Sequence, residues 1–350
     1  MVMFLVGDTV LVERMIYKDN VKVYQSMTNT SVSGKETTRS PPIKRIIILT
    51  YLRAGSSFFG QLFNANPNVF YLFEPLIFFN KFYETTILHR TLKKEIETAE
   101  YYELGKGLED MLNCNFSIPN IIEKYKLAFN PAYLKNMNGI GHIGSTHLTN
   151  LYLHSSTKLL SFFQTTEAEG ITRNNIEKFC QRSSLQVAKV IRLGDIEYAS
   201  SHLQEDLNLH IIHLVRDPRA ISNSRYEAGF TQLSSPDKIC TPMIRNIVKG
   251  NLLDSTRYSL FKYEDFAIDP INKTKMLYRN LGLGDVPTTV EAWIKENTKA
   301  SVNGKSFYSL KRNGTKSALH WVKQLAADMK QKFESHTDCI EIFKKMNYAF

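Results

Sequence analysis

Four residues suited to binding an anion follow the first strongly apolar segment of the chain. The stretch "RIIILTYLRAGSSFFGQLF", residues 45–63, leads through a turn with Arg53, Gly55, Ser56 and Ser57 into helical spacing. The first N–H groups of a helix lack intrahelical partners and its dipole favours negative charge, so this arrangement predicts a phosphate site. ATP and GTP loops read GxxxxGKS or GKT, whereas this turn has one glycine and no lysine. An ordinary strand-to-helix turn is the alternative.

A second charged turn lies in "HIIHLVRDPRAISNSR", residues 210–225. An apolar segment ends at Arg216, Asp217 and Pro218 are typical of a helix start, and the helix carries Ser224. Arginine suits phosphate because its planar fork binds two oxygens and stays protonated. A capped helix whose arginines are solvated or paired with Asp217 is the alternative. Two such turns in one sheet favour a ligand with phosphates at both ends.

The rest of the pattern predicts the frame that positions these turns. Apolar segments alternate with helical ones, which indicates an α/β fold with a P-loop-like parallel sheet flanked by helices. We expect strands within residues 45–52, 68–75, 184–193, 207–217 and 257–266. Ligands of such sheets bind beyond the carboxyl ends of the strands. The charged residues expected at those ends are Arg53, Glu74, Arg192, Arg216 and Glu264.

Two parts of the chain depart from this alternation. Residues 17–44 are rich in Ser, Thr and Lys, so we expect residues 1–44 to form an N-terminal stalk or linker before a domain at 45–350. The opening "MVMFLV" is shorter than a membrane span of about 20 apolar residues or a signal core of about 7 to 15, so no membrane span is evident. This leaves a cytosolic protein or one whose anchor is missing. Residues from about 76 to 181 indicate a long helical insertion.

Composition narrows the class of partner. The 350 residues are 43% hydrophobic and carry a formal net charge of +10, which favours a globular protein with an anionic partner. No zinc-finger spacing, RNP-type aromatic motif or lysine-rich run is present. We therefore expect no nucleic-acid partner.

Cysteines and histidines give no metal-site pattern. The four cysteines are far apart in the sequence and form no CxxC pair, so we expect no metal site: Cys114, Cys180, Cys240 and Cys339. Their even number permits either two disulfides or four buried thiols. Four N-x-S/T sequons are close to the number that chance gives in so Asn-rich a chain, and they begin at Asn29, Asn115, Asn272 and Asn313.

Several motifs together resemble the carbohydrate 6-O-sulfotransferases, Golgi enzymes that act on galactose, N-acetylgalactosamine or N-acetylglucosamine. The resemblance is carried by "LRAGSSFFGQLFNANPNVFYLFEP", "VAKVIRL", "HLVRDPRAISNSR" and "LFKYEDFAIDPINKTKMLYRNLGL", and it is weakest across the insertion. It implies transfer of a sulfuryl group from 3′-phosphoadenosine 5′-phosphosulfate (PAPS) to the 6-hydroxyl of a sugar in a glycan or proteoglycan. It also implies a glycoprotein of the Golgi lumen with two disulfides of open pairing and an N-terminal membrane anchor, which this sequence does not show.

The resemblance also implies roles for individual residues. The 5′ end of the donor would be bound by Arg53, Ala54, Gly55, Ser56 and Ser57. Arg216 and Ser224 would hold the 3′-phosphate. "SLKRNGTKSALHW" is similar to the segment that closes over the nucleotide, which makes Lys311 and Arg312 lesser candidates. Because sulfuryl transfer resembles phosphoryl transfer, we expect Arg53 to stabilise charge on the transferring oxygens.

Glu74 is the expected general base for the sugar hydroxyl. It ends the second predicted strand, and Pro75 turns the chain away after it. The resemblance agrees, since related sulfotransferases use a glutamate after the second strand. A structural ion pair with Arg53 or another arginine is the alternative role. Three histidines of the insertion are rival bases: His142, His147 and His154.

Two other functions fit the same fold. A nucleotide-dependent kinase would need a Walker lysine and a magnesium carboxylate after a strand, and neither is evident. A non-catalytic glycan-binding relative would keep the fold without the chemistry. The sequence does not indicate the acceptor sugar or the oligomeric state.

Overall fold

A computed structural model describes residues 44–78, 98–118, 121–122, 172–200, 206, 208–298 and 313–349. The chain divides into two units, Met1–Ser40 and Pro41–Phe350, and the described residues all belong to the second. The expected stalk at 1–44 therefore lies outside the described residues except for Lys44. Much of the expected insertion at 76–181 does too.

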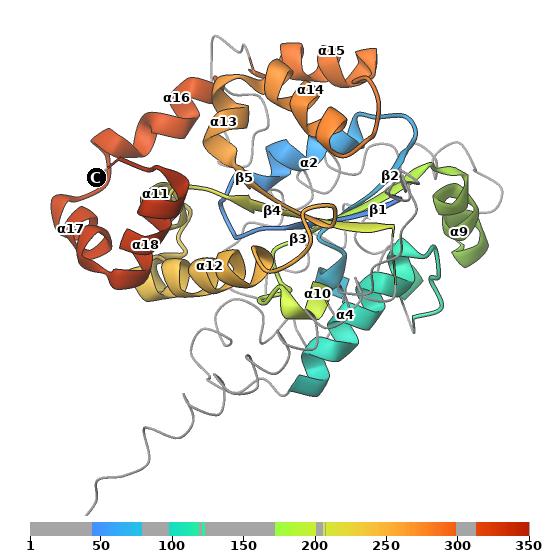
Figure 1. Ribbon diagram of the computed structural model, residues 1–350, viewed down its shortest axis with the longest axis horizontal. Helices are drawn as coiled ribbons and strands as arrows, with labels where there is room; N and C mark the ends of the chain where they lie inside the picture. The colour runs from blue at the N-terminus through green and yellow to red at the C-terminus, as the bar shows by residue number, and fades with distance from the viewer. Residues whose placement is uncertain are drawn as a thin grey trace, which may run out of the picture. The chain divides into compact units, whose positions relative to one another are not determined.

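A five-stranded sheet forms the centre of the described unit, and all of its strand pairs are parallel, as predicted (Figure 1). Its spatial order is β2-β3-β1-β4-β5, so β1 is central. The strands are β1 (Arg45–Leu49), β2 (Val69–Phe73), β3 (Leu185–Val190), β4 (Leu209–Val215) and β5 (Tyr258–Lys262).

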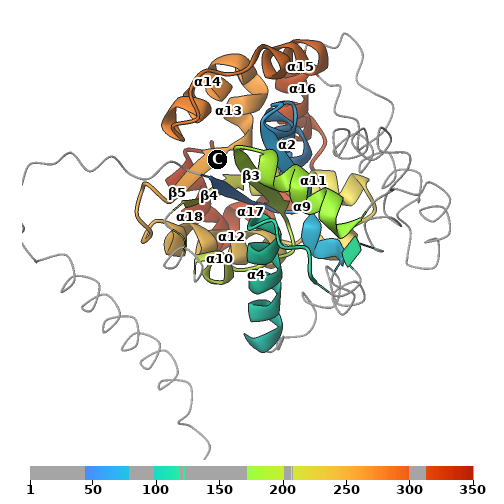
Figure 2. The ribbon, with the colours of Figure 1, turned by 90° about the vertical axis from the view of Figure 1, so that its right-hand side faces the viewer.

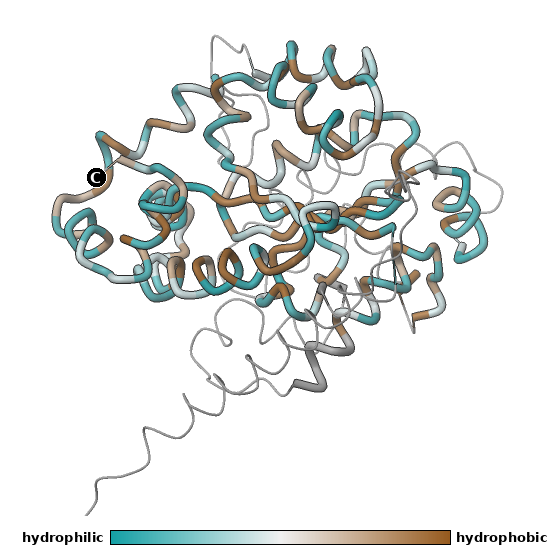
Figure 3. The backbone as a smooth tube through the Cα atoms, viewed as in Figure 1, coloured by the Kyte–Doolittle hydropathy of each residue, from teal (hydrophilic) through white to brown (hydrophobic). Residues whose placement is uncertain are grey.

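Helices cover both faces of the sheet (Figures 1 and 2), which explains why the strands are nearly continuous apolar runs. One face carries α2 (Ser56–Asn64), α13 (Tyr263–Ile268), α14 (Pro270–Asn280) and α15 (Thr288–Thr298). The other carries α4 (Thr98–Leu112), α10 (Glu197–Ser200) and α12 (Pro236–Gly250). Hydrophobic residues concentrate along the strands in Figure 3.

The remaining elements lie around this core. These elements are η1 (Pro75–Phe78), α9 (Arg173–Arg182), α11 (Pro218–Glu227), η5 (Thr231–Leu233), α16 (Gly314–Leu319), η6 (His320–Lys323), α17 (Ala327–Ser335) and α18 (Thr337–Met346). Helix α18 packs on α12. The described part of the expected insertion contains α4 and α9, and the rest of it is not described.

Two disulfides fasten helices together. Cys240 of α12 is bonded to Cys339 of α18, and Cys114, just after α4, is bonded to Cys180 of α9. The expectation of two bridges is therefore confirmed. The structure supplies the pairing, which the sequence left open.

Only the first part of the fifth predicted strand is a strand in the structure. Residues 257–266 were expected to be extended, but β5 ends at Lys262 and the chain turns directly into α13. Glu264 and Asp265 lie in the first turn of that helix, where negative charge interacts well with the helix dipole. A short apolar run does not distinguish strand from helix by periodicity, which is why the prediction was wrong here.

The strand order reverses at β1. From β1 the chain builds β2 and β3 on one side and β4 and β5 on the other. The carboxyl ends of β1 and β4 therefore lie side by side at a topological switch point, where α/β proteins bind ligands. We call residues 50–55 the first turn and residues 216–217 the second turn.

Candidate active site

The backbone conformation of the first turn lets a ligand approach the N–H groups of the turn closely. Arg53 and Gly55 both have left-handed backbone conformations, with φ of 68° and 80°. Gly55 is the N-cap of α2, which has no acidic residue in its first turn. A Cβ at Gly55 would lie 2.2 Å from the Tyr263 ring, so only glycine fits there. The N-terminus of the helix and these conformations suit an anion site.

The second turn delivers Arg216 from β4 to the start of α11. The Asp217 carboxylate caps this helix by accepting a hydrogen bond from the Arg219 N–H, and Pro218 occupies the first helical position, as predicted. Arg219 also forms an ion pair with Asp217 and another with Glu334 of α17. These contacts hold the start of α11 in place, and they do not involve the side chain of Arg216.

Three side-chain hydrogen bonds join the first turn to the second turn and to α11, which follows the second turn. Arg53 Nε donates to Ser224 Oγ at 3.0 Å, and Arg216 Nη1 donates to the Arg53 carbonyl oxygen at 3.1 Å. Arg225 Nε donates to the carbonyl oxygen of Leu52 at 3.1 Å. Residues far apart in sequence are therefore brought into one cluster. We call Arg53, Arg216 and Arg225 the arginine cluster.

Arg225 is a buried cation held by neutral oxygens. It is 6% exposed, and its Nη1 donates to the Leu233 carbonyl oxygen at 2.6 Å. Burial lowers the pKa of Arg225 to about 10, which still leaves it protonated at neutral pH. Sequence reasoning placed Arg225 on this helix but assigned it no role, because that role depends on which carbonyl groups lie beside it.

Tyr263 lies between the turns and was also missed from the sequence. Its ring limits the space at Gly55, and the Arg216 guanidinium carbon lies 5.0 Å from the ring centroid. Phe58 of α2 packs edge-on against the same ring at 6.4 Å between centroids. Tyr263 begins α13, inside the segment that was expected to be a strand, so its position could not be inferred.

A buried polar network supports the first turn from beneath. Tyr51 Oη is hydrogen-bonded to His213 Nε2, and His213 Nδ1 to Tyr258 Oη, each at 2.9 Å. Asn246 Nδ2 of α12 donates to Tyr51 Oη at 3.1 Å. Burial lowers the pKa of His213 to about 3, so this imidazole is neutral. The network rigidifies the turn and adds no charge to it.

Glu74 forms a separate charged cluster at the ends of β2 and β3. Its carboxylate accepts from Lys189 Nζ at 2.5 Å and also contacts Arg192 Nη1. Burial alone would raise the pKa of Glu74, but the two cations outweigh it and lower the pKa to about 2. Glu74 also has a left-handed backbone, with φ of 46°. We call Glu74, Lys189 and Arg192 the Glu74 cluster.

The alternative role of Glu74 was an ion pair with Arg53 or another arginine. In the structure its carboxylate is paired with Arg192. Lys189 is fully buried, and its ammonium lies 3.9 Å from the Phe73 ring centroid. A buried lysine was not expected from the strand "LQVAKV" and was missed.

Several expected residues cannot be placed. Lys311, Arg312 and the three rival histidines lie outside the described residues. Among the residues that the structure does describe, no group of three His, Cys, Asp or Glu side chains could hold a metal ion.

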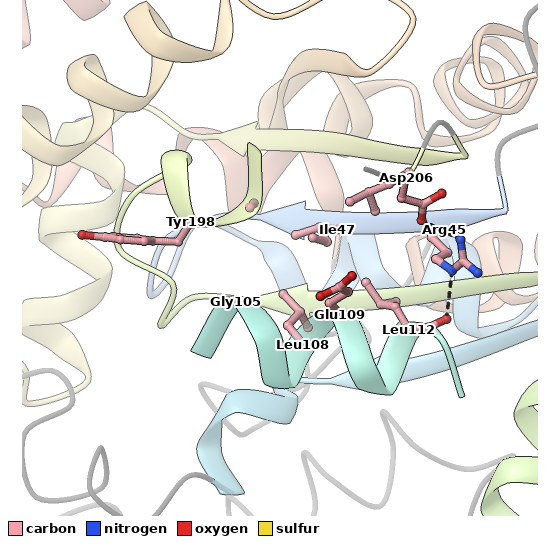
Figure 4. Close-up of a pocket in the computed structure, with 10 residues that line it drawn as sticks. Arg45, Ile47, Gly105, Leu108, Glu109, Leu112, Tyr198 and Asp206 are labelled. Carbon is pink, nitrogen blue, oxygen red and sulfur yellow. Dashed lines mark hydrogen bonds and ion pairs between the residues drawn. The ribbon is translucent and has the colours of Figure 1, made fainter. Parts of the chain in front are cut away.

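A pocket at the opposite end of the sheet lies away from both clusters (Figure 4). It lies between α4, α10 and the amino-terminal ends of β1 and β4, and Ile47, Leu108 and Leu112 contribute apolar lining. Arg45 closes one side through a 2.5 Å ion pair with Asp206 and a hydrogen bond to the Leu112 carbonyl oxygen. None of its lining residues belongs to the first turn, the second turn or either cluster.

Two solved sulfotransferase structures align with this chain at low identity. The sulfotransferase domain of a Synechococcus olefin synthase aligns over 91% of this chain and 100% of its own, with 17% identity and a TM-score of 0.47. A mouse sulfotransferase complexed with PAP aligns over 93% and 92%, with 11% identity and a TM-score of 0.41. Such TM-scores support no conclusion about this chain.

Curated relatives are more informative. Carbohydrate sulfotransferase 1 of Danio rerio is 28% identical over 87% of this chain and 77% of its own length. Carbohydrate sulfotransferase 3 of Rattus norvegicus is 26% identical over 79% of this chain and 62% of its own length. Carbohydrate sulfotransferase 1 of Mus musculus is 27% identical over 81% and 74%. These relatives confirm the resemblance to carbohydrate sulfotransferases.

The family model described as the sulfotransferase domain matches residues 44–348. This range includes both turns, Glu74 and all five strands. The chain therefore belongs to the sulfotransferase domain family.

Proposed function

We propose that this protein transfers a sulfuryl group from PAPS to the 6-hydroxyl of a sugar in a glycan or proteoglycan. The observation that carries the proposal is the first turn joined to the second turn and to α11 through Arg53, Arg216 and Arg225 at the switch point of the sheet. A donor with anionic groups at both ends needs two cationic turns at one site. The carbohydrate acceptor follows the names of the curated relatives.

The first turn is assigned to the 5′-phosphosulfate of the donor. Arg53 and the backbone from Ala54 through Gly55 to Ser56 and Ser57 offer a guanidinium and the N-terminal N–H groups of α2. Arg53 is the cation assigned to the charge that develops on the transferring oxygens and the leaving phosphate.

The second turn is assigned to the 3′-phosphate. Arg216 supplies the positive charge and Ser224 a hydroxyl. Ser224 Oγ accepts from Arg53, so its own hydrogen is available for a phosphate oxygen. Arg312 would add a further contact from the segment that closes over the nucleotide.

Glu74 is assigned as the general base. In the reaction the acceptor oxygen bonds to sulfur, the bond from sulfur to the phosphate oxygen breaks, and the hydroxyl proton passes to Glu74. The low pKa keeps the carboxylate in the deprotonated form that a base needs. Lys189 and Arg192 weaken its basicity, and an anionic donor nearby would offset them.

The proposed location is the Golgi lumen, where a glycosylated enzyme would meet its glycan acceptors. Two disulfides suit an oxidising compartment. None of the helices in the described part of the chain is long and apolar enough to cross a membrane.

A sulfate-transfer assay with labelled PAPS tests the function. We expect label to enter chondroitin, keratan or N-glycan acceptors at the sugar 6-position. Arg53→Ala should lower kcat strongly, whereas Arg279→Ala, an exposed arginine of α14, should leave transfer unchanged. Intact PAPS binding without transfer to any sugar would favour the non-catalytic relative, and phosphoryl transfer from ATP would favour the kinase.

A further inference from the structure

Arg216 uses two of its three nitrogens on backbone carbonyl groups. Nη1 donates to the carbonyl oxygen of Arg53, and Nη2 donates to that of Ser317 at 3.1 Å. Its Nε is buried and has no hydrogen-bond partner among the described residues. The guanidinium is therefore oriented by neutral groups while one charged N–H is unsatisfied.

Ser317 of α16 has an unsatisfied group beside the same guanidinium. Its Oγ is buried and also has no hydrogen-bond partner in the described part of the chain. Leaving a buried polar group unsatisfied destabilises the folded protein. Two such groups therefore flank the hydrogen bond from Arg216 to Ser317, and this is unusual enough to require an explanation.

The position of Ser317 is fixed by close packing of α16 on α13. A Cβ at Gly314 would lie 2.1 Å from the Ala267 carbonyl oxygen, so the two helices approach through bare backbone. Asn313 caps α16 by accepting from the Lys316 N–H, and the Ser317 N–H donates to the Asn313 carbonyl oxygen. The hydroxyl is thus carried by a short helix that is tied to the frame of the site.

We propose that Ser317 is a further ligand of the donor's 3′-phosphate, acting together with Arg216 Nε. This inference rests on the proposed function, because it assumes that PAPS is the donor. One phosphate accepts hydrogen bonds from both a guanidinium N–H and a hydroxyl, so a single group would satisfy both donors. Ser317 then makes the site selective for nucleotides that carry a 3′-phosphate.

Calorimetric titration with two nucleotides tests the assignment. The probes are the desulfated donor product, 3′-phosphoadenosine 5′-phosphate (PAP), and adenosine 5′-phosphate, which lacks the 3′-phosphate. Ser317→Ala should weaken PAP binding roughly tenfold and leave adenosine 5′-phosphate binding unchanged, since it removes one hydrogen bond to a charged group of PAP that adenosine 5′-phosphate lacks. Ser317→Thr, which keeps the hydroxyl, should restore most of the PAP affinity.

Ser335→Ala is the matched control, because this serine of α17 is exposed and its hydroxyl donates to the Lys332 carbonyl oxygen of its own helix. The thermal midpoint of unliganded Ser317→Ala should equal or exceed that of the wild type, since an unsatisfied hydroxyl is removed. Unchanged PAP affinity, or an equal loss for both nucleotides, would overturn the assignment alone. A wild-type protein that does not bind PAP would overturn both the assignment and the proposed function.

Discussion

The arginine cluster and the Glu74 cluster both lie at the carboxyl ends of the strands, but their cations have different partners. Arg216 and Arg225 donate to neutral carbonyl oxygens, which orient a guanidinium without cancelling its charge. In the Glu74 cluster one carboxylate pairs with both Lys189 and Arg192. The hydrogen bonds of Arg216 and Arg225 therefore do not cancel the charge of these two arginines, whereas in the Glu74 cluster one carboxylate offsets part of the charge of two cations.

This difference separates binding from chemistry. Cations that are hydrogen-bonded to neutral groups keep their attraction for phosphate, and replacing a carbonyl oxygen by a phosphate oxygen breaks no ion pair. A carboxylate held between two cations is fixed in position and protonation state, as a group at a reaction centre needs to be. We therefore expect changes in the arginine cluster to alter donor affinity and changes in the Glu74 cluster to alter turnover.

The largest effect should come from Glu74→Gln. The amide keeps the size of the side chain but cannot accept the hydroxyl proton, so kcat should fall by roughly 10²- to 10⁴-fold. Steady-state kinetics with labelled PAPS measure this, and PAP affinity by calorimetry should stay near that of the wild type. Glu291→Gln, an exposed partner of Lys275, is the control. Wild-type turnover in Glu74→Gln would remove Glu74 from the chemistry and redirect attention to the histidines of the insertion.

Arg216→Ala should give the next largest effect, on affinity. Losing charge-assisted hydrogen bonds to the 3′-phosphate should weaken PAP binding by roughly 10²- to 10³-fold. Calorimetry measures the affinity, and Arg279→Ala provides a matched exposed arginine. An unaltered PAP affinity would contradict the assignment of the second turn, and the distinction between the clusters would fail.

The Glu74 ion pairs should also make the stability of the folded protein depend on pH. The pKa of Glu74 is lowered from 4.5 to about 2 in the folded protein, so its stabilising contribution is full above about pH 4.5 and is lost as the pH falls toward 2. The free energy of unfolding of the wild type relative to Glu74→Gln should therefore decrease by about 3 kcal/mol over that range. Urea unfolding of both proteins at pH 6 and near pH 2 measures the difference. A difference independent of pH would mean that the ion pairs do not form.

Arg225→Lys should have the smallest effect. Lysine keeps the charge but cannot reach both carbonyl oxygens with the same geometry, and one lost hydrogen bond is worth about 1 kcal/mol. PAP affinity should decrease about fivefold, with little change in kcat at saturating donor. A large loss of kcat instead would show that Arg225 acts on the chemistry and not on the donor site.

The sequence predicted those features of the site that are contiguous along the chain. Arg53 and Gly55 lie in one turn, and Ser224 lies on the helix that begins two residues after Arg216, so local patterns were sufficient. Tyr263 and Ser317 could not be predicted, because they reach the site through the strand order and through packing between α13 and α16.

Local patterns also left the balance of charge in the site undetermined. Lys189 stands in an apolar strand, and only the pairing of β3 with β2 brings it to Glu74. The five strands were recognisable because burial on both faces requires apolar runs. The end of the fifth strand was not, since short apolar strands and helices share the same composition.

The central place of β1 has a consequence for the protein's synthesis. β1 is made before the other four strands, yet Arg45 pairs with Leu209 on one side and Gln186 on the other. At about 5–20 residues per second, the ribosome needs roughly 10–30 s to deliver β4 after β1. During that time an apolar strand with two open edges is exposed to other chains, so newly made protein depends on chaperones more than its compact final sheet suggests.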